Sequence, residues 1–283
     1  MQTALMAATV ALYTAGCAAG LLYVNGRGRA AQWHYRMFVV AGFLAQTGLG
    51  LLRWGETGSF PVTQVGESAW LLVWFMVLAI VVTDYVYGLP MLAPFLLPAV
   101  VLLTVVGLLP GHTGSFRAAA WTPLHVVAVV LGFCAFAVAA TASVLYLVQE
   151  RALKTKTPDG IPGRLPALET LDRVNFHALV FGFAVLTVGL GIGITAASGT
   201  GGLGPTWWRD PKVMLSELVW VFYGAVVACR MVRTLSGRPI AKLTVLGFAL
   251  VLVVLVGADR LVPGVHAKLG EGTETQGMST QGK

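Results

Sequence analysis

The chain has 283 residues, of which 57% are hydrophobic and only 11% are charged, and its mean hydropathy is +0.78. This composition lies far outside that of soluble globular domains, so it excludes an ordinary soluble enzyme and predicts an integral membrane protein. The net charge is +7. The basic residues form no stripe suited to nucleic acid, so no nucleic-acid partner is expected, and we interpret them as signals for insertion and for contact with membrane lipid.

The chain contains eight apolar runs that approach or reach the roughly 20 residues needed to cross a hydrocarbon core of about 30 Å. Residues 248–256, for example, are apolar throughout and do not alternate with polar residues, which argues against a transmembrane barrel. The first run has no basic stretch ahead of it and is long enough to span, so we interpret it as a helix and not as a signal peptide. The sequence predicts an all-α polytopic bundle with spans at 3–24, 37–54, 69–87, 89–110, 121–149, 174–197, 213–232 and 241–261.

The 19 basic residues are divided 12 to 7 between the two sets of connecting segments. The larger group follows the first, fifth and seventh runs, and the positive-inside rule assigns those segments to the cytoplasm. We therefore expect a multi-pass protein of the bacterial cytoplasmic (inner) membrane with both termini outside. In this interpretation 1–269 is a single helical domain, and 270–283, which has no apolar periodicity, is a disordered outer tail.

A short polar segment with two adjacent tryptophans, 203–212, separates the sixth and seventh runs. Trp207 and Trp208 are typical of either an aromatic belt at the membrane surface or the wall of a flat ligand site. Charged side chains beside them can pair with the carboxylates of a bound molecule. These charged residues are Arg209, Asp210 and Lys212.

Two of the five histidines are expected on the same outer surface as this segment. His125 opens the fifth run, and His266 lies just beyond the eighth. Two neutral imidazoles with aromatic walls are the elements of a bis-histidine haem site, although unrelated surface histidines have the same spacing. We assign no ligand role to the other three, His34, His112 and His177.

Cysteines and intramembrane acids complete the list of reactive side chains. The three cysteines lie inside predicted spans without close spacing, which suits apolar packing and excludes a haem-attachment run: Cys17, Cys134 and Cys229. Ionisable groups in hydrocarbon cost about 2.5–3.5 kcal/mol on insertion scales and tend to be functional. Glu217 either pairs with the charges of the tryptophan segment or makes a local helix contact, and Asp84 is expected to reach water near the inner end of its helix.

Several motifs resemble those of the CcsA/ResC-type cytochrome c assembly proteins and their HemX-like relatives, whose signature is a tryptophan-rich WWD segment. The matching positions in that segment and the helix after it are Gly204, Trp207, Asp210, Pro211, Lys212, Trp220, Tyr223 and Arg230. Further matches lie at 61–68 with Trp74, at Leu124 and His125, at 143–148, at Leu171 and Asp172, and at 264–266. The resemblance covers most of the chain from residue 60 onward.

This resemblance implies that the chain holds haem b transiently, with His125 and His266 ligating the iron. It further implies that Trp207 and Trp208 shield the porphyrin, and that Arg209 or Lys212 holds the propionates. The implied partners are apocytochrome c and a second membrane subunit of the ResB/CcsB type. The chain would then be a component of a system II-type cytochrome c synthase, and we assign it no catalytic residue of its own.

The departures from the family pattern favour an alternative. Leu203, Arg209 and Val213 replace two tryptophans and a glutamate, and Ala228 stands where the family has an intramembrane histidine that is taken to hold haem on its way across. The resemblance therefore implies outer-face haem binding more strongly than haem transport through this chain. A HemX-like membrane factor that affects haem synthesis or assembly without transferring haem is the alternative, and a transporter with broken, repeated helices is a third.

Overall fold

The computed structural model describes residues 2–26, 28–58, 65–106, 122–156, 165–199, 207–209, 211–232 and 236–261. Within these residues the chain forms eight α-helices and one 3-10 turn, with no strand, so the all-α prediction is confirmed. The elements are α1 (Gln2–Val24), α2 (Gly28–Thr57), α3 (Val65–Tyr87), α4 (Ala93–Val106), α5 (Thr122–Thr155), α6 (Leu168–Gly199), η2 (Trp207–Arg209), α7 (Pro211–Met231) and α8 (Arg238–Leu261).

Membrane crossing follows from helix length and apolar composition. In the described part of the chain, six helices are long and apolar enough to cross a membrane, namely α1, α2, α3, α5, α6 and α7. A helix of about 20 residues spans the hydrocarbon core because each residue adds 1.5 Å. The prediction of a polytopic helical membrane protein is therefore confirmed.

Several helices extend beyond the apolar runs that predicted them. α2 begins at Gly28 and not at 37, α5 continues to Thr155 beyond 149, and α6 begins at Leu168 ahead of 174. The added turns of α5 and α6 carry ion pairs between residues four apart, which stabilise helices where they enter water. Two of these pairs are Glu150 with Lys154 at 2.6 Å and Glu169 with Arg173 at 3.0 Å. Hydropathy therefore marks the hydrocarbon-facing part of a helix and not its ends.

The fourth helix differs from the prediction in length. α4 has 14 residues, against the run of 89–110 expected from hydropathy. The connection from α3 turns at Gly88, whose φ of +62° lies in the left-handed region that favours glycine. The amide of Leu89 then donates to the carbonyl of Thr83 at 3.3 Å, which closes the end of α3. The apolar run therefore begins with a turn. Residues 88 and 90, a glycine and a proline, lie between α3 and α4 and do not interrupt a spanning helix, whereas transporters have helices that are broken within the span.

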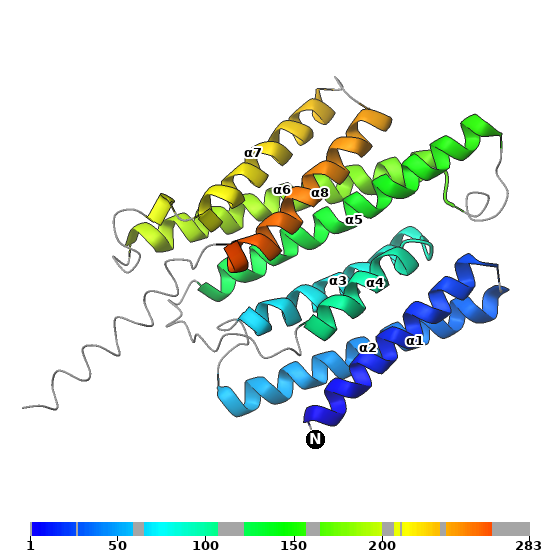
Figure 1. Ribbon diagram of the computed structural model, residues 1–283, viewed down its shortest axis with the longest axis horizontal. Helices are drawn as coiled ribbons and strands as arrows, with labels where there is room; N and C mark the ends of the chain where they lie inside the picture. The colour runs from blue at the N-terminus through cyan, green and yellow to red at the C-terminus, as the bar shows by residue number, and fades with distance from the viewer. Residues whose placement is uncertain are drawn as a thin grey trace, which may run out of the picture.

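The helices run alternately in opposite directions, so their ends gather at two ends of the bundle (Figure 1). One end, here the tryptophan end, holds the start of α5, the end of α6 and the start of α7. The opposite end, here the arginine end, holds Arg36, Asp172 and Arg230. α5 lies between α3 and α4 on one side and α6 and α8 on the other. Its buried residues join two hydrophobic clusters, with Cys134 in one and Phe136 in the other.

Small residues bring α5 and α6 into backbone contact. A Cβ atom added at Gly132 would lie 3.2 Å from the carbonyl oxygen of Gly182, and one added at Gly189 would lie 3.1 Å from the backbone nitrogen of Val129. Close approach of this kind is what glycine allows in membrane helix pairs, where van der Waals packing drives association. The contact stripe on α6 continues to Gly193, which faces His125 at the start of α5. This helix pairing is what positions the candidate site.

Candidate functional site

His125 lies in the first turn of α5 and is held by α6. Thr122 and Pro123 open the helix, because proline at the first turn loses no intrahelical hydrogen bond. The half-buried imidazole places its Nδ1 2.7 Å from the carbonyl oxygen of Gly189. A carbonyl oxygen only accepts hydrogen bonds, so Nδ1 is the donor. In the neutral ring the lone pair is therefore on Nε2, which is the form of histidine that binds a metal.

Gly193 provides the space in which the ring lies. A Cβ atom added there would come within 2.7 Å of Cε1 and 2.8 Å of Nδ1 of His125, closer than real Cβ contacts allow. At Gly191, two residues away on the same helix, an added Cβ atom would meet open space. Gly193 therefore lies on the face of α6 that contacts the imidazole, whereas Gly191 is exposed on another face of the same helix.

Trp208 and Arg209 form the described part of the tryptophan segment. They belong to η2, which directly precedes α7, and the guanidinium carbon of Arg209 lies 4.7 Å from the centroid of the Trp208 ring. Cation–π contact of this kind orients a guanidinium over an aromatic face. Trp208 is 51% exposed, so both side chains are accessible at the tryptophan end of the bundle.

Several predicted site residues lie outside the described residues. These are His266 and Asp210, together with the side chains of Trp207 and Lys212. The structure therefore places His125, Trp208 and Arg209 at one end of the bundle and leaves the remaining members of the predicted site as predictions.

Residues of the α7 motif prove to be packing residues. Trp220 donates from Nε1 to the hydroxyl of Thr187 at 2.9 Å and stacks on Phe183. Tyr223 is fully buried and stacks face to face on Phe136, with ring centroids 3.7 Å apart. These contacts join α7 to α6 and α5. The motif residues therefore hold α7, the helix that follows directly after the tryptophan segment, against α5 and α6.

Asp172 and Arg230, two positions in separate motifs, form an ion pair between α6 and α7 at the arginine end. The Arg230 guanidinium also lies 5.7 Å from the centroid of the Phe176 ring. Sequence reasoning identified both positions by resemblance but did not pair them. The signal available was their opposite charge at the same expected depth of the membrane.

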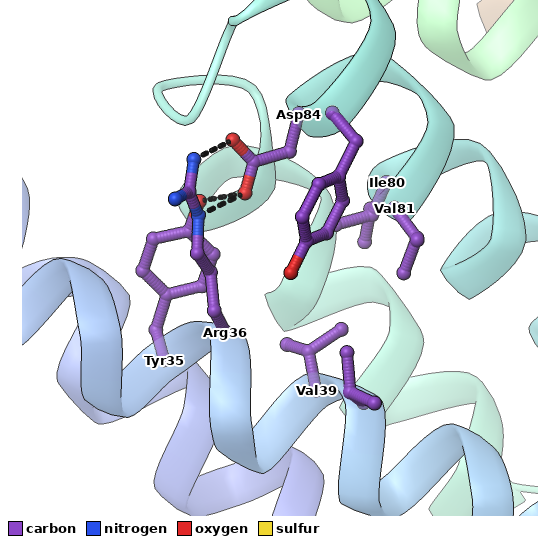
Figure 2. Close-up of a pocket in the computed structure, with 8 residues that line it drawn as sticks. Tyr35, Arg36, Val39, Ile80, Val81 and Asp84 are labelled. Atoms are coloured by element: carbon purple, nitrogen blue, oxygen red, sulfur yellow. Dashed lines mark hydrogen bonds and ion pairs between the residues drawn. The ribbon is translucent and has the colours of Figure 1, made fainter.

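A second buried charge lies between α2 and α3, where Figure 2 shows Tyr35 and Arg36 converging on Asp84. Arg36 donates through Nε at 2.8 Å and Nη2 at 2.7 Å to the two carboxylate oxygens, and the Tyr35 hydroxyl also donates to Asp84. The expectation that Asp84 reaches water is wrong, because its side chain is only 3% exposed. The small pocket beside this ion pair is lined otherwise by valine, isoleucine and tyrosine side chains. The ion pair itself joins α2 to α3.

The remaining reactive side chains separate into exposed and packed groups. Glu217 is exposed on α7, and so are His34 and His177 on α2 and α6. Cys134 is buried and Cys17 and Cys229 are partly buried, as expected of packing residues. Among the described residues no group of three or more histidine, cysteine or acidic side chains is suited to hold a metal ion.

Ala228, which stands in place of an intramembrane histidine, lies on an exposed face of α7. The same face carries Leu218, Val221 and Met231, which are also exposed. A methyl group offers no lone pair to iron, so this face of α7 provides no axial ligand at position 228.

These features define a polytopic helical membrane protein in which an imidazole is held between two helices at one end of the bundle. Residues 62–266, well over half of the chain, match the family model described as Cytochrome C assembly protein. The chain belongs to that family.

Curated relatives agree with this assignment. The chain is 28% identical over 251 residues to the cytochrome c biogenesis protein CcsA of Prochlorococcus marinus (strain MIT 9215), covering 77% of this chain and 78% of the relative. It is 25% identical to the protein of the same name from Guillardia theta, over 76% and 78% of the two chains. A third CcsA, from Thermosynechococcus vestitus, is 26% identical over 79% and 83%. The similarity therefore extends over most of each protein.

Proposed function

We propose that this chain is a membrane cytochrome c biogenesis protein that binds haem at its outer face and presents it to apocytochrome c. The observation that carries the proposal is the hydrogen bond from His125 to Gly189 in a chain of the cytochrome c assembly family. Haem b is cargo in this account, and the apocytochrome thiols add to its vinyl groups. The chain contributes ligation, orientation and shielding.

The donor set of His125 fits an axial ligand of haem iron. Because Nδ1 is engaged with a carbonyl oxygen, Nε2 carries the lone pair. Ligating histidines almost always have such a partner on their other ring nitrogen, which fixes the tautomer and the ring orientation. We assign His266 as the second ligand from its motif at the end of the family match.

The tryptophan segment supplies the wall and the charges of the proposed site. Trp208 has an exposed aromatic face, and Arg209 already lies against it. Guanidinium groups bind carboxylates with two parallel hydrogen bonds, which suits a haem propionate. In the proposal Trp207 adds a second aromatic face, and Lys212 and Asp210 complete the polar edge.

The proposed setting is the bacterial cytoplasmic membrane, with the tryptophan end and both termini outside. The alternation of helices supports this arrangement, because the helix ends that flank the more basic connecting segments lie at the arginine end (Figure 1). The proposed partners are apocytochrome c and a second membrane subunit of the ResB/CcsB type, so that together they form a system II-type synthase.

The exposed methyl group of Ala228 favours a second candidate. A chain without an intramembrane ligand at this position, but with the outer imidazole, either receives haem by another route or acts as a HemX-like factor that affects haem synthesis or assembly. The two candidates differ in whether substitution of the outer imidazole abolishes cytochrome c maturation.

Cytochrome c maturation in cells tests the proposal through His125. In a strain that depends on this chain, His125→Ala is expected to lower covalently bound haem in cytochrome c by about tenfold or more. Loss of the hydrogen-bond partner of a metal ligand alone lowers metal affinity or activity by about 10–100-fold, and loss of the ligand itself is expected to lower it further. The measurement is haem staining of denaturing gels, with immunoblots to confirm equal amounts of the chain.

His177→Ala is the matched control, because that imidazole is exposed and its hydrogen-bond contact with the Tyr87 hydroxyl is long, at 3.4 Å. It is expected to leave maturation unchanged. Wild-type amounts of cytochrome c in the His125→Ala strain would contradict the proposal and favour the HemX-like candidate.

A further inference from the structure

We propose that Gly189 and Gly193 of α6 are positioning residues that set the tautomer and place of His125, and through it the reduction potential of the bound iron. This inference rests on the proposed function, since it concerns the same imidazole. It adds two residues of another helix to the site, and both act through the imidazole.

The carbonyl of Gly189 fixes the tautomer of the ring. It lies 2.7 Å from Nδ1 and accepts the ring proton there. The alternative tautomer would place a lone pair on Nδ1 against a carbonyl lone pair, which is repulsive, so Nε2 is the nitrogen left to bind a metal. The close approach of α5 to Gly189, with Val129 at 3.0 Å from a Cβ added there, is what brings the carbonyl within reach.

Gly193 provides the space for the ring. It lies one helical turn beyond Gly189 on the same face of α6, and an added methyl group would lie 2.7 Å from Cε1 of His125. The imidazole is the end of a flexible side chain in the first turn of α5, so rotation of the ring away from α6 relieves the overlap at the least cost. Rotation removes Nδ1 from the Gly189 carbonyl. A glycine at 193 is therefore needed for the hydrogen bond at 189.

The hydrogen bond has an electronic consequence for iron. Donation from Nδ1 raises the basicity of the ring and makes Nε2 a stronger electron donor. A stronger donor stabilises the ferric state relative to the ferrous state, and second-shell hydrogen bonding is one of the ways in which a protein tunes haem iron. The α6 glycines thereby hold the outer ligand in its more strongly donating form, which lowers the reduction potential of the iron.

Gly193→Ala tests the inference, and Gly191→Ala is its matched control. Both add one methyl group to the same helix and gain the same helix propensity, but only Gly193 faces the ring. With purified protein reconstituted with haemin, Gly193→Ala is expected to weaken haem binding by about 10- to 100-fold. The fraction that still binds is expected to have a higher reduction potential. Gly191→Ala is expected to match wild type in both.

A measurement without haem separates a failure of this inference from a failure of the proposed function. Diethyl pyrocarbonate modifies accessible imidazole, and rotation away from α6 is expected to speed modification of His125 in Gly193→Ala, read by mass spectrometry. If His125→Ala leaves haem binding intact, the proposed function fails. If His125→Ala abolishes binding but Gly193→Ala equals Gly191→Ala in affinity, potential and modification rate, only the positioning inference is overturned.

Discussion

Arg36→Ala is expected to destabilise the protein by about 3–5 kcal/mol, the cost of leaving a buried charge without its partner. The carboxylate of Asp84 is 3% exposed and accepts two hydrogen bonds from Arg36 at 2.7 and 2.8 Å. Without the guanidinium, the Tyr35 hydroxyl is the one hydrogen-bond donor that the described residues leave to this carboxylate (Figure 2). Thermal unfolding in detergent, followed by tryptophan fluorescence, measures the loss.

Two controls make this result specific to the buried pair. Arg173→Ala removes a partner from Glu169 in an ion pair whose side chains are 63% and 84% exposed, so it is expected to cost about 0–1 kcal/mol. The double variant Arg36→Met with Asp84→Leu removes both charges and is expected to recover most of the stability, because apolar replacement of a buried pair is often neutral. Equal destabilisation by Arg36→Ala and Arg173→Ala would refute a structural role for the pair.

Gly182→Ala is expected to lower stability by about 1–3 kcal/mol through overpacking at the α5–α6 contact. The new methyl group would lie 2.8 Å from Cε1 of Phe136, and that ring is fully buried and stacks on Tyr223 of α7 at 3.7 Å. The ring cannot move without disturbing α7. The expected result is a lower unfolding temperature together with loss of haem, because α7 follows directly from the tryptophan segment.

Gly191→Ala again supplies the control for this change. It gains roughly 1 kcal/mol of helix propensity without a clash, so its unfolding temperature is expected to equal or exceed that of wild type. The difference between the two variants therefore isolates the steric term. A Gly182→Ala protein as stable as Gly191→Ala would show that α5 and α6 are not in the close contact described.

Apolar runs located the helices because a membrane span must be apolar over its whole length. The ends of α2, α5 and α6 were placed inside the limits that the structure shows. In α5 and α6 the outermost turns carry ion pairs, such as Glu150 with Lys154, whose charges lower the hydropathy. The break at Gly88 lies between the predicted spans 69–87 and 89–110, but residues 89–92, which precede α4, were assigned to a span because most of them are apolar. Hydropathy measures the solvent preference of side chains and does not depend on backbone conformation, so it does not show where an apolar run turns.

The candidate site could be predicted only in part. His125 was identified from its place at the start of a span, and resemblance added weight to it. Its contact with Gly193 depends on the register between two antiparallel helices, which no spacing within one helix reveals. The pairing of Asp172 with Arg230 depends on the same kind of information. The positions of His266 and Asp210 stay predictions, because they lie outside the described residues.

The central claim is that His125 and His266 ligate haem at the outer face, and the reduced-minus-oxidised spectrum of the purified chain tests it most directly. Wild-type protein in mild detergent is expected to show a b-type haem signal, and both His125→Ala and His266→Ala are expected to weaken it. Absence of haem from the wild type, even after co-expression with a candidate ResB/CcsB-type subunit and ample haem, would contradict the account. So would a signal that neither substitution changes.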